Sequence, residues 1–237
     1  MIVSGRNNVK EILRDNMQSF EIKKAICQNN FNESDIISLL KKMNIPIFYE
    51  EKHKLDKITK NNHQGIILET SDFVYSNLQD IIEGKDSIKL LILDHIEDPH
   101  NLGAIIRTVE ACGMDGIILP INRSVSVNET VMKTSVGTLS NVKICQVTNL
   151  MNTIKYLKKN GFWIYGADMN GEDYSKIDYA KKTCLIIGNE GNGLSHIVRE
   201  ACDFIVSIPM CGKVNSLNAS VAAGILMYGI QKNNSKY

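Results

Sequence analysis

Short apolar runs alternate with segments of helical spacing through the last two thirds of the chain. The runs lack polar alternation, which is typical of strands buried on both faces of a parallel sheet. The expected strands are residues 90–93, 116–119, 142–147, 162–166, 185–187 and 204–208. The expected helices are residues 102–112, 149–159, 194–201 and 217–230. This order predicts an α/β fold with helices on both faces of a mostly parallel sheet.

The first third of the chain repeats the alternation on a smaller scale. Helical patterns lie around residues 9–13, 34–43 and 52–59, an apolar stretch lies near residues 25–26, and strand patterns lie at residues 45–49 and 65–68. A mixed, polar stretch follows before the next buried strand. We therefore expect a small α/β domain at 1–75, a linker at 76–88 and a larger domain at 89–237.

Composition narrows the function classes only slightly. Hydrophobic residues make up 43% of the chain, enough for a folded core, and Lys plus Arg number 27 against 26 Asp plus Glu. This balance does not by itself indicate nucleic acid. The six cysteines show no C-x-x-C pair, so we expect neither a metal site nor disulfides. No signal peptide or membrane span is evident, and we expect a cytoplasmic protein.

The first candidate loop, DHIEDPHNLGAIIRT at 94–108, runs from a strand end into a helix. Asn101 is a suitable helix cap, and Arg107 would lie one to two turns into the helix. The forked guanidinium of Arg107 could bind a phosphate. On these residues alone, a capped helix with a solvated arginine explains the pattern equally well.

The second loop, LIIGNEGNGLS at 185–195, also joins a strand to a helix. Its three glycines allow a tight turn and close approach of backbone N–H groups to a ligand. The spacing matches neither the dinucleotide nor the phosphate-loop signature. Because the carboxylate of Glu190 would repel a phosphate, a ligand with hydroxyls or a positive charge is favoured. A simple glycine turn would explain the glycines but not the carboxylate.

The third loop, IPMCGKVNSLNASVAAGIL at 208–226, follows a strand and opens a helix. Ser216 or Asn218 lies in capping range of that helix. The small residues at 219–224 would let the helix approach another backbone closely, either in a tight core or at a subunit interface.

Taken together, the three loops resemble the motifs of SpoU (TrmH) type RNA 2′-O-ribose methyltransferases of the SPOUT superfamily. The motifs DPHNLGAIIRT, IIGNEGNGLS and IPMCGKVNSLNASVAAG occur in the family's order, and the resemblance covers residues 90–231. The segments SGRNNVKEIL and NNHQGIILE are similar to the small RNA-binding domain of the RlmB branch, which modifies 23S (large-subunit) rRNA. The resemblance implies a C-terminal trefoil knot, the cofactor S-adenosylmethionine and a homodimer whose sites take residues from both chains.

The resemblance also assigns residues to the site. The implied cofactor-binding residues are Gly188, Asn189, Gly193, Ile208, Met210 and Leu217. The implied catalytic residues are Asn101, Arg107, Glu190, Ser216 and Asn218. Since a guanidinium is a poor base, we expect Arg107 to clamp a phosphate rather than accept a proton.

The function expected from these features is methylation of a ribose 2′-hydroxyl, with a guanosine of 23S rRNA as the preferred target. A tRNA ribose or a resistance-type rRNA site remains an alternative, and a non-catalytic RNA-binding protein is a weaker one. A dinucleotide-dependent oxidoreductase is disfavoured, because the glycine spacing is wrong and the acidic residue of the βαβ unit is missing.

Overall fold

The computed structural model describes residues 1–15, 20–135, 137–189 and 191–232. The chain forms two compact units. Unit 1 comprises Met1–Val74 and Val127–Ser140, and unit 2 comprises Tyr75–Ser126 and Asn141–Tyr237. Residues 127–140 thus belong to the first unit although they lie between two strands of the second in the sequence.

Unit 1 is built on a four-stranded sheet in the order β1-β4-β2-β3. The pairs β1–β4 and β2–β4 are antiparallel, whereas β2 and β3 are parallel. Its elements are β1 (Ile2–Ser4), α1 (Arg6–Asp15), β2 (Ile22–Gln28), α2 (Ser34–Lys42), β3 (Ile47–Glu50), α3 (Lys52–Ile58), β4 (Ile66–Thr70) and α6 (Glu129–Ser135), with the short 3-10 helix η1 (Thr138–Asn141) after α6. The first third of the chain therefore forms the α/β arrangement that its pattern predicts.

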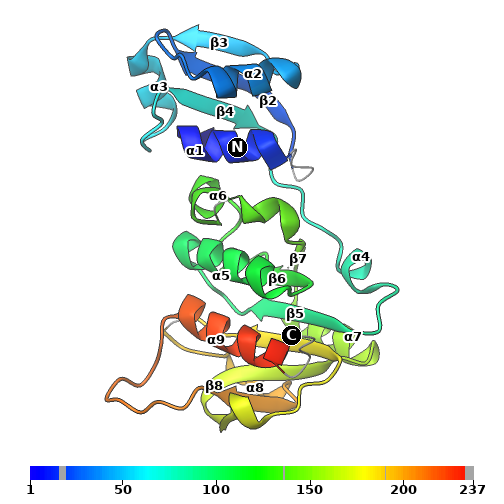
Figure 1. The fold of residues 1–237 in the computed structure, drawn as a ribbon. Helices are drawn as coiled ribbons and strands as arrows, with labels where there is room; N and C mark the ends of the chain where they lie inside the picture. Colours follow the sequence, from blue (N-terminus) through cyan, green and yellow to red (C-terminus); the bar gives the residue numbers. More distant parts are fainter. Residues whose placement is uncertain (16–19, 136, 190, 233–237) are drawn as a thin grey trace. The chain divides into compact units, whose positions relative to one another are not determined.

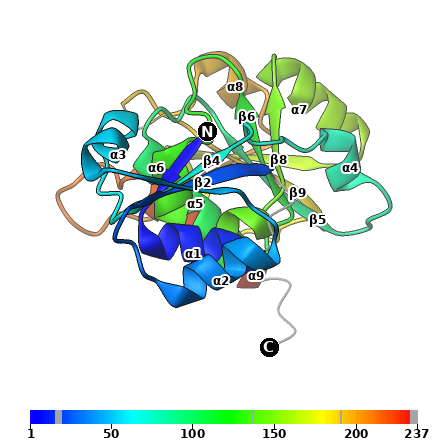
Figure 2. The same ribbon diagram turned by 90° about the horizontal axis from the view of Figure 1, so that it is seen from above.

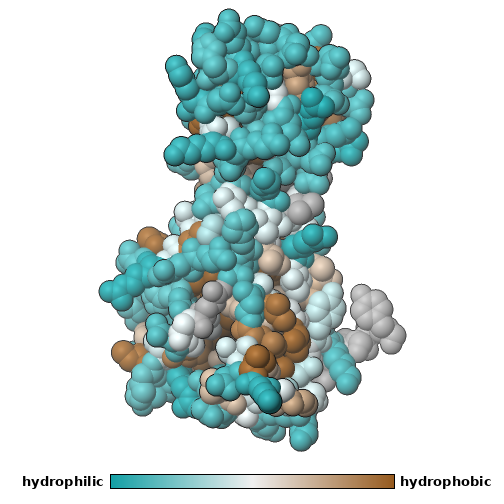
Figure 3. Space-filling view, turned by 90° about the vertical axis from the view of Figure 1, so that its left-hand side faces the viewer, coloured by the Kyte–Doolittle hydropathy of each residue, from teal (hydrophilic) through white to brown (hydrophobic). Residues whose placement is uncertain are grey.

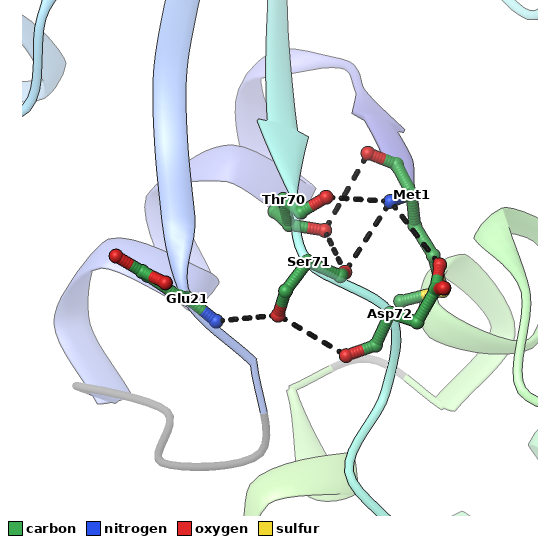
Figure 4. A network of polar contacts seen from close by, with 5 residues as sticks. All are labelled: Met1, Glu21, Thr70, Ser71 and Asp72. Atoms are coloured by element: carbon green, nitrogen blue, oxygen red, sulfur yellow. Dashed lines mark hydrogen bonds and ion pairs between the residues drawn. The ribbon is translucent and has the colours of Figure 1, made fainter.

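Segments far apart in the sequence meet within unit 1. Helix α6 contacts β1, and the Glu129 carboxylate accepts hydrogen bonds from the hydroxyls of Ser4 and Thr59. Figure 4 shows a second junction, at the end of β4, where the Met1 amine donates to the Thr70 carbonyl oxygen at 2.6 Å. These contacts fix both ends of the small sheet.

Unit 2 contains a six-stranded sheet in the order β10-β8-β9-β5-β6-β7. Figure 1 labels β5, β6, β7 and β8 of this sheet. Each pair of neighbouring strands in this order is parallel, which confirms the predicted sheet type. The strands are β5 (Ile88–Leu93), β6 (Gly116–Pro120), β7 (Ile144–Val147), β8 (Trp163–Asp173), β9 (Lys182–Ile187) and β10 (Phe204–Ser207). The helices are α4 (Leu78–Ile82), α5 (Pro99–Cys112), α7 (Leu150–Lys159), α8 (His196–Glu200) and α9 (Ala219–Lys232), with the 3-10 helix η2 (Tyr174–Lys176) after β8.

Helices cover both faces of this sheet. Side chains of α4, α7 and α8 pack against β5, β8 and β9 in one buried cluster that includes Ile92, Leu157 and Ile186. On the opposite face α5 contacts β6 and α9 contacts β9, and the two helices contact each other. Figure 2 shows α7 and α8 on one side of the strands of this unit and α5 on the other. Because β9 lies between β8 and β5, the loops that follow these strands emerge at the same edge of the sheet.

Two local expectations differ from the structure. Asn101 does not cap α5: the N-cap is Asp98, whose carboxylate accepts the His100 N–H at 2.9 Å, and Pro99 occupies the first turn. Proline suits that position because its missing N–H would have no helical partner. Strand β8 continues to Asp173 instead of ending near residue 166, because pairing with β10 resumes after a register shift.

Candidate active site

A pocket of about 380 Å³ lies beside the middle of β8, where β9 and β10 end and α9 begins. Three stretches of chain and the first turns of α9 form its walls. The lining residues are Ala167, Asp168, Met169, Asn170, Ile187, Gly188, Asn189, Gly191, Asn192, Gly193, Val206, Ser207, Ile208, Met210, Asn215, Ser216, Leu217, Ala219, Ala222 and Leu226. All six residues expected to bind a cofactor, and Ser216, are thus brought together in one cavity.

The glycine loop after β9 is a tight turn. Asn189 and Gly193 exchange backbone hydrogen bonds of 3.1 and 2.8 Å. A Cβ atom on Gly188 would lie 2.2 Å from the Gly193 carbonyl carbon, and Gly193 has a φ of +65°. Both positions therefore require glycine for backbone reasons.

Side chains join this loop to the one that follows β5. The Asn189 amide donates to the His95 carbonyl oxygen at 2.8 Å and accepts the Gly191 N–H at 2.9 Å. The buried Asp94 carboxylate accepts the Ser195 N–H at 3.2 Å and contacts the His95 ring. Asp94 and His95 were not singled out from the sequence. Their position directly after a buried strand was the available signal.

The start of α9 is tied to α5. The Asn218 side-chain oxygen accepts the Ser220 N–H at 2.9 Å, which confirms Asn218 as a cap of α9. Its amide donates to the Asn101 side-chain oxygen at 3.0 Å. The two asparagines therefore meet beside Leu217, which lines the pocket.

The two charged residues expected in the active site, Arg107 and Glu190, are not among the described residues that line the pocket. Arg107 is exposed on α5 and is absent from the described residues that line the pocket. Its helix neighbours Ala104 and Thr108 border a separate groove of about 740 Å³ between α5 and α9. Glu190 lies outside the described residues.

Sequence reasoning missed the wall contributed by β8. Ala167, Asp168, Met169 and Asn170 line the pocket from the polar continuation of this strand. Among the described lining residues Asp168 is the one charged side chain, and its carboxylate lies 3.4 Å from the Arg199 Nε. The Arg199 guanidinium therefore compensates part of the Asp168 charge.

The cysteines do not supply a nucleophile to this pocket. All six are free thiols, and burial raises the pKa of Cys145 and Cys202 to about 12. Since the thiolate is the reactive form, these two thiols are inert near neutral pH.

Among the described residues no group of three potential metal ligands is found, and no helix there is long and apolar enough to cross a membrane.

Comparison with known proteins agrees with this geometry. The model of the SpoU rRNA Methylase family matches residues 89–228, and the model "RNA 2′-O ribose methyltransferase substrate binding" matches residues 2–76. The chain belongs to the SpoU rRNA methylase family. It is therefore an RNA methyltransferase of the SpoU/TrmH type, with a substrate-binding segment ahead of the methylase segment.

Relatives and solved structures of this family extend over nearly the whole chain. A putative TrmH family tRNA/rRNA methyltransferase, YacO of Bacillus subtilis, is 38% identical over 235 residues, 97% of this chain and 94% of the relative. A protein of the same description from Staphylococcus saprophyticus is 40% identical, with the same coverage. The SpoU methyltransferase AviRb of Streptomyces viridochromogenes, solved with AdoMet, has a TM-score of 0.86 at 21% identity, covering 100% of this chain and 91% of AviRb. An AdoMet-bound rRNA methyltransferase of Sinorhizobium meliloti has a TM-score of 0.81 at 24% identity, covering 98% and 86%.

Proposed function

We propose that this SpoU-family chain transfers the methyl group of S-adenosylmethionine to a ribose 2′-hydroxyl, with a guanosine of 23S rRNA as its target. The observation that carries the proposal is the pocket at the ends of β9 and β10, beside the middle of β8, which unites the glycine loop with residues 208–217. Relatives described as tRNA/rRNA methyltransferases support an RNA substrate of either kind. The similarity of residues 1–75 to the RlmB branch favours rRNA.

The pocket suits S-adenosylmethionine chemically. Ile187, Val206 and Leu226 provide apolar surface for an adenine ring. The lining side chains of Asn170, Asn215 and Ser216 provide donors and acceptors for hydroxyl and amino-acid groups. Among the described residues no Lys or Arg side chain lines the pocket, so no lining cation there would repel a sulfonium. The solved neighbours AviRb and the S. meliloti enzyme, which bind AdoMet, share this fold.

When bound, the cofactor supplies a methyl group that its sulfonium has already activated. The protein's task is then to align the ribose oxygen and help remove its proton. We assign Arg107 to clamping the phosphate beside that ribose, since its guanidinium cannot act as an efficient base. The Asn101–Asn218 pair would orient the ribose or Arg107, with Ser216 beside them. Glu190 is assigned to the geometry of the glycine loop or to a substrate hydroxyl.

We also propose that the enzyme is a homodimer, with a second copy seated on the groove between α5 and α9. Val221 and Tyr228 on α9 border this groove and are 49% and 55% exposed. Figure 3 shows hydrophobic surface gathered on the face of this unit where Figure 1 places α9. Arg107 lies on the helix that borders the groove, so pairing would bring it into a shared site. We further propose that the C-terminal segment of this chain forms the trefoil knot expected of the family.

The proposal is tested by incubating the purified protein with labelled S-adenosylmethionine and, separately, with 23S rRNA and tRNA transcripts. We expect methyl transfer to 23S rRNA and a 2′-O-methylguanosine at the mapped position. Methyl transfer to tRNA alone would mean that the substrate is tRNA and not 23S rRNA. Binding of S-adenosylmethionine without transfer to any RNA would support a non-catalytic RNA-binding protein instead. Binding of NAD but not S-adenosylmethionine would overturn the assignment.

A further inference from the structure

His95 follows β5 by two residues, and its backbone lies in the left-handed region at a φ of +61°. Side chains rarely adopt that region, and residues held there often lie at functional sites. Three other described non-glycine residues share it, namely Asn44, Gln64 and Arg123. Among these four described residues His95 is distinguished by its side chain, which is paired with a buried carboxylate.

Asp94 orients the imidazole ring of His95. The Asp94 side chain is 1% exposed, its Oδ1 hydrogen-bonds Nδ1 of the ring, and its Oδ2 accepts the Ser195 N–H at 3.2 Å. With Nδ1 against the carboxylate, the single proton of the neutral ring belongs on Nδ1, and the Nε2 lone pair is left to accept a proton. Nε2 has no hydrogen-bond partner among the described residues, and the side chain is 38% exposed. A substrate can therefore reach it.

The loop that begins with His95 borders the cofactor pocket. The His95 carbonyl oxygen accepts the amide of Asn189, which lines the pocket, at 2.8 Å. At the other end of the loop Asn101 contacts Asn218, whose chain neighbour Leu217 also lines the pocket. An acceptor hydroxyl comes to a bound cofactor from outside, and its proton acceptor must be within hydrogen-bond reach of it. A group at the border of the pocket meets that requirement.

Charged groups of both signs surround the imidazole. Among the described residues the Asp94 carboxylate is the one in direct contact with the ring. The rest of the loop carries further charged or titratable groups, as does the segment after β6, where Ser124 and Val125 donate hydrogen bonds to the Ile96 carbonyl oxygen. These groups are Glu97, Asp98, His100 and Arg123.

Methyl transfer to a ribose hydroxyl needs a proton acceptor, and the assignment of Arg107 to a phosphate leaves that role open. We propose that His95 is the proton acceptor of the reaction and that Asp94 is its positioning residue. His95 Nε2 takes the hydroxyl proton as the ribose oxygen bonds to the methyl carbon, and the electron pair of the sulfur–methyl bond stays on sulfur. The positive charge passes from sulfur to the imidazolium, which Asp94 stabilises until the proton leaves to water. This inference rests on the proposed RNA methyltransferase function.

The first test needs neither RNA nor cofactor. In the full-length protein labelled with nitrogen-15 at its five histidines, NMR reports which ring nitrogen carries the proton, and His95→Asn identifies the His95 signal by its loss. We expect the neutral ring of His95 to carry its proton on Nδ1 and to leave Nε2 bare. A neutral ring protonated on Nε2 would overturn the proposal.

Two variants test the chemistry in single-turnover methylation of an RNA that the wild type methylates. Asparagine and glycine both tolerate the left-handed region, so His95→Asn and His95→Gly should keep the turn. Each should lower the rate by at least about 100-fold, with little change in S-adenosylmethionine affinity. The wild-type rate should rise with pH and level off between about pH 5 and 8, where an imidazole loses its charge, and His95→Asn should lack this levelling. Added imidazole should restore the rate of His95→Gly by about tenfold or more, because it fits the space left by the ring.

His196→Asn is the matched control. His196 also lies near a carboxylate, Glu200 at 3.6 Å, but its side chain is 83% exposed on α8 and lies outside the pocket. This variant should keep the wild-type rate and pH profile. A rate close to that of the wild type in His95→Asn would overturn the proposal. Slowed variants that keep the wild-type pH profile and do not respond to imidazole would also overturn it, since that result indicates a structural role.

Cofactor binding and methyl transfer by the wild type are measured in parallel. If the wild type transfers no methyl group to RNA, the proposed function is contradicted. If the wild type is active and only the expectations for the His95 variants fail, only this inference is contradicted.

Discussion

Gly188 is the residue of the pocket at which a side chain is least tolerable. Its Cβ would lie 2.2 Å from one backbone carbon of Gly193 and 2.4 Å from the Leu194 nitrogen, and neither atom can move without opening the turn. We expect Gly188→Ala to lower the free energy of unfolding by at least about 2 kcal/mol, as overpacking against fixed atoms does. It should also abolish S-adenosylmethionine binding. Thermal unfolding and calorimetry measure the two effects.

Gly191→Ala is the control in the same loop. The nearest atom to its Cβ would be the Asn189 side-chain oxygen at 3.5 Å, an ordinary contact. Its stability should stay within about 0.5 kcal/mol of the wild type. If both variants unfold at the wild-type temperature, the tight turn is not what requires glycine at residue 188.

Arg107 is expected to act on the reaction rather than on the fold. It is exposed on α5, so Arg107→Ala should change stability by less than about 0.5 kcal/mol. If its guanidinium clamps a phosphate in the transition state, single-turnover methylation should fall by about 100-fold or more, with little change in cofactor affinity. Arg107→Lys should recover little, because an ammonium lacks the planar fork of donors.

The informative comparison is between rate and affinity in the same preparation. A rate close to that of the wild type in Arg107→Ala would remove the residue from the mechanism. A loss of rate explained entirely by weaker S-adenosylmethionine binding would move Arg107 from the chemistry to cofactor binding.

At the scale of elements, the N-terminus of α5 gives a pH-dependent prediction. The His100 N–H and the Asn101 side chain hydrogen-bond the Asp98 carboxylate and lower its pKa below the ordinary value. The cap therefore contributes stability above the unfolded-state pKa of aspartate and loses it as the pH falls through the lower, folded-state pKa. Asp98→Ala should cost about 1 kcal/mol at neutral pH. Thermal unfolding at several pH values should show the difference in melting temperature between the wild type and Asp98→Ala becoming smaller in acid.

Asp98→Asn separates capping from charge. An asparagine side chain still accepts the His100 N–H but does not titrate, so this variant should stay closer to the wild type at neutral pH, and its stability should not carry the acid dependence of the cap. An Asp98→Ala deficit that is constant from neutral to acid pH would contradict the assignment of the cap to the ionised carboxylate.

The buried elements were predictable because their apolar runs carry the signal. Strands β5, β6 and β9 coincide closely with runs of Ile and Leu. Helix α4 and the polar second half of β8 were not predicted, since short or exposed segments lack periodicity. Their conformations depend on pairing and packing with segments distant in the sequence.

In the candidate site, too, features with a local sequence signal could be predicted, whereas contacts between distant residues could not. The glycines at 188, 191 and 193 and the residues from 208 to 217 could be named from motifs, and they line one pocket. The Asn101–Asn218 contact joins residues 117 positions apart, and nothing local in the sequence specifies it. Asn101 also resembles a cap when read alone. The pairing of Asp98 with Pro99 at the start of α5 is the stronger signal.

At the scale of the whole molecule, division into units does not follow the order of the sequence. Val127–Ser140 belongs to unit 1, although β6 and β7 on either side of it belong to unit 2. The Glu129 carboxylate ties this segment to Ser4 and Thr59, which come from two different parts of the small domain. A cut in the sequence near residue 76 therefore separates Glu129 from its partners. The full chain is the appropriate material for the experiments above.

The proposed dimer gives the last prediction. The groove between α5 and α9 is bordered by exposed Val221 and Tyr228, and a two-fold interface repeats any change on both subunits. Val221→Glu would place two carboxylates in an apolar contact, so we expect sedimentation to shift from twice 26.5 kDa to 26.5 kDa. Methylation should fall with it if Arg107 acts only in the assembled pair.

Ile197→Glu is the matched control, because Ile197 is 63% exposed on α8 and lies outside that groove. It adds the same charge to the same unit and should leave the dimer and its activity intact. A wild-type protein that sediments as a monomer with full activity at micromolar concentration would contradict the pairing. If Val221→Glu is monomeric yet fully active, one chain suffices for catalysis, and Arg107 must reach the pocket of its own subunit.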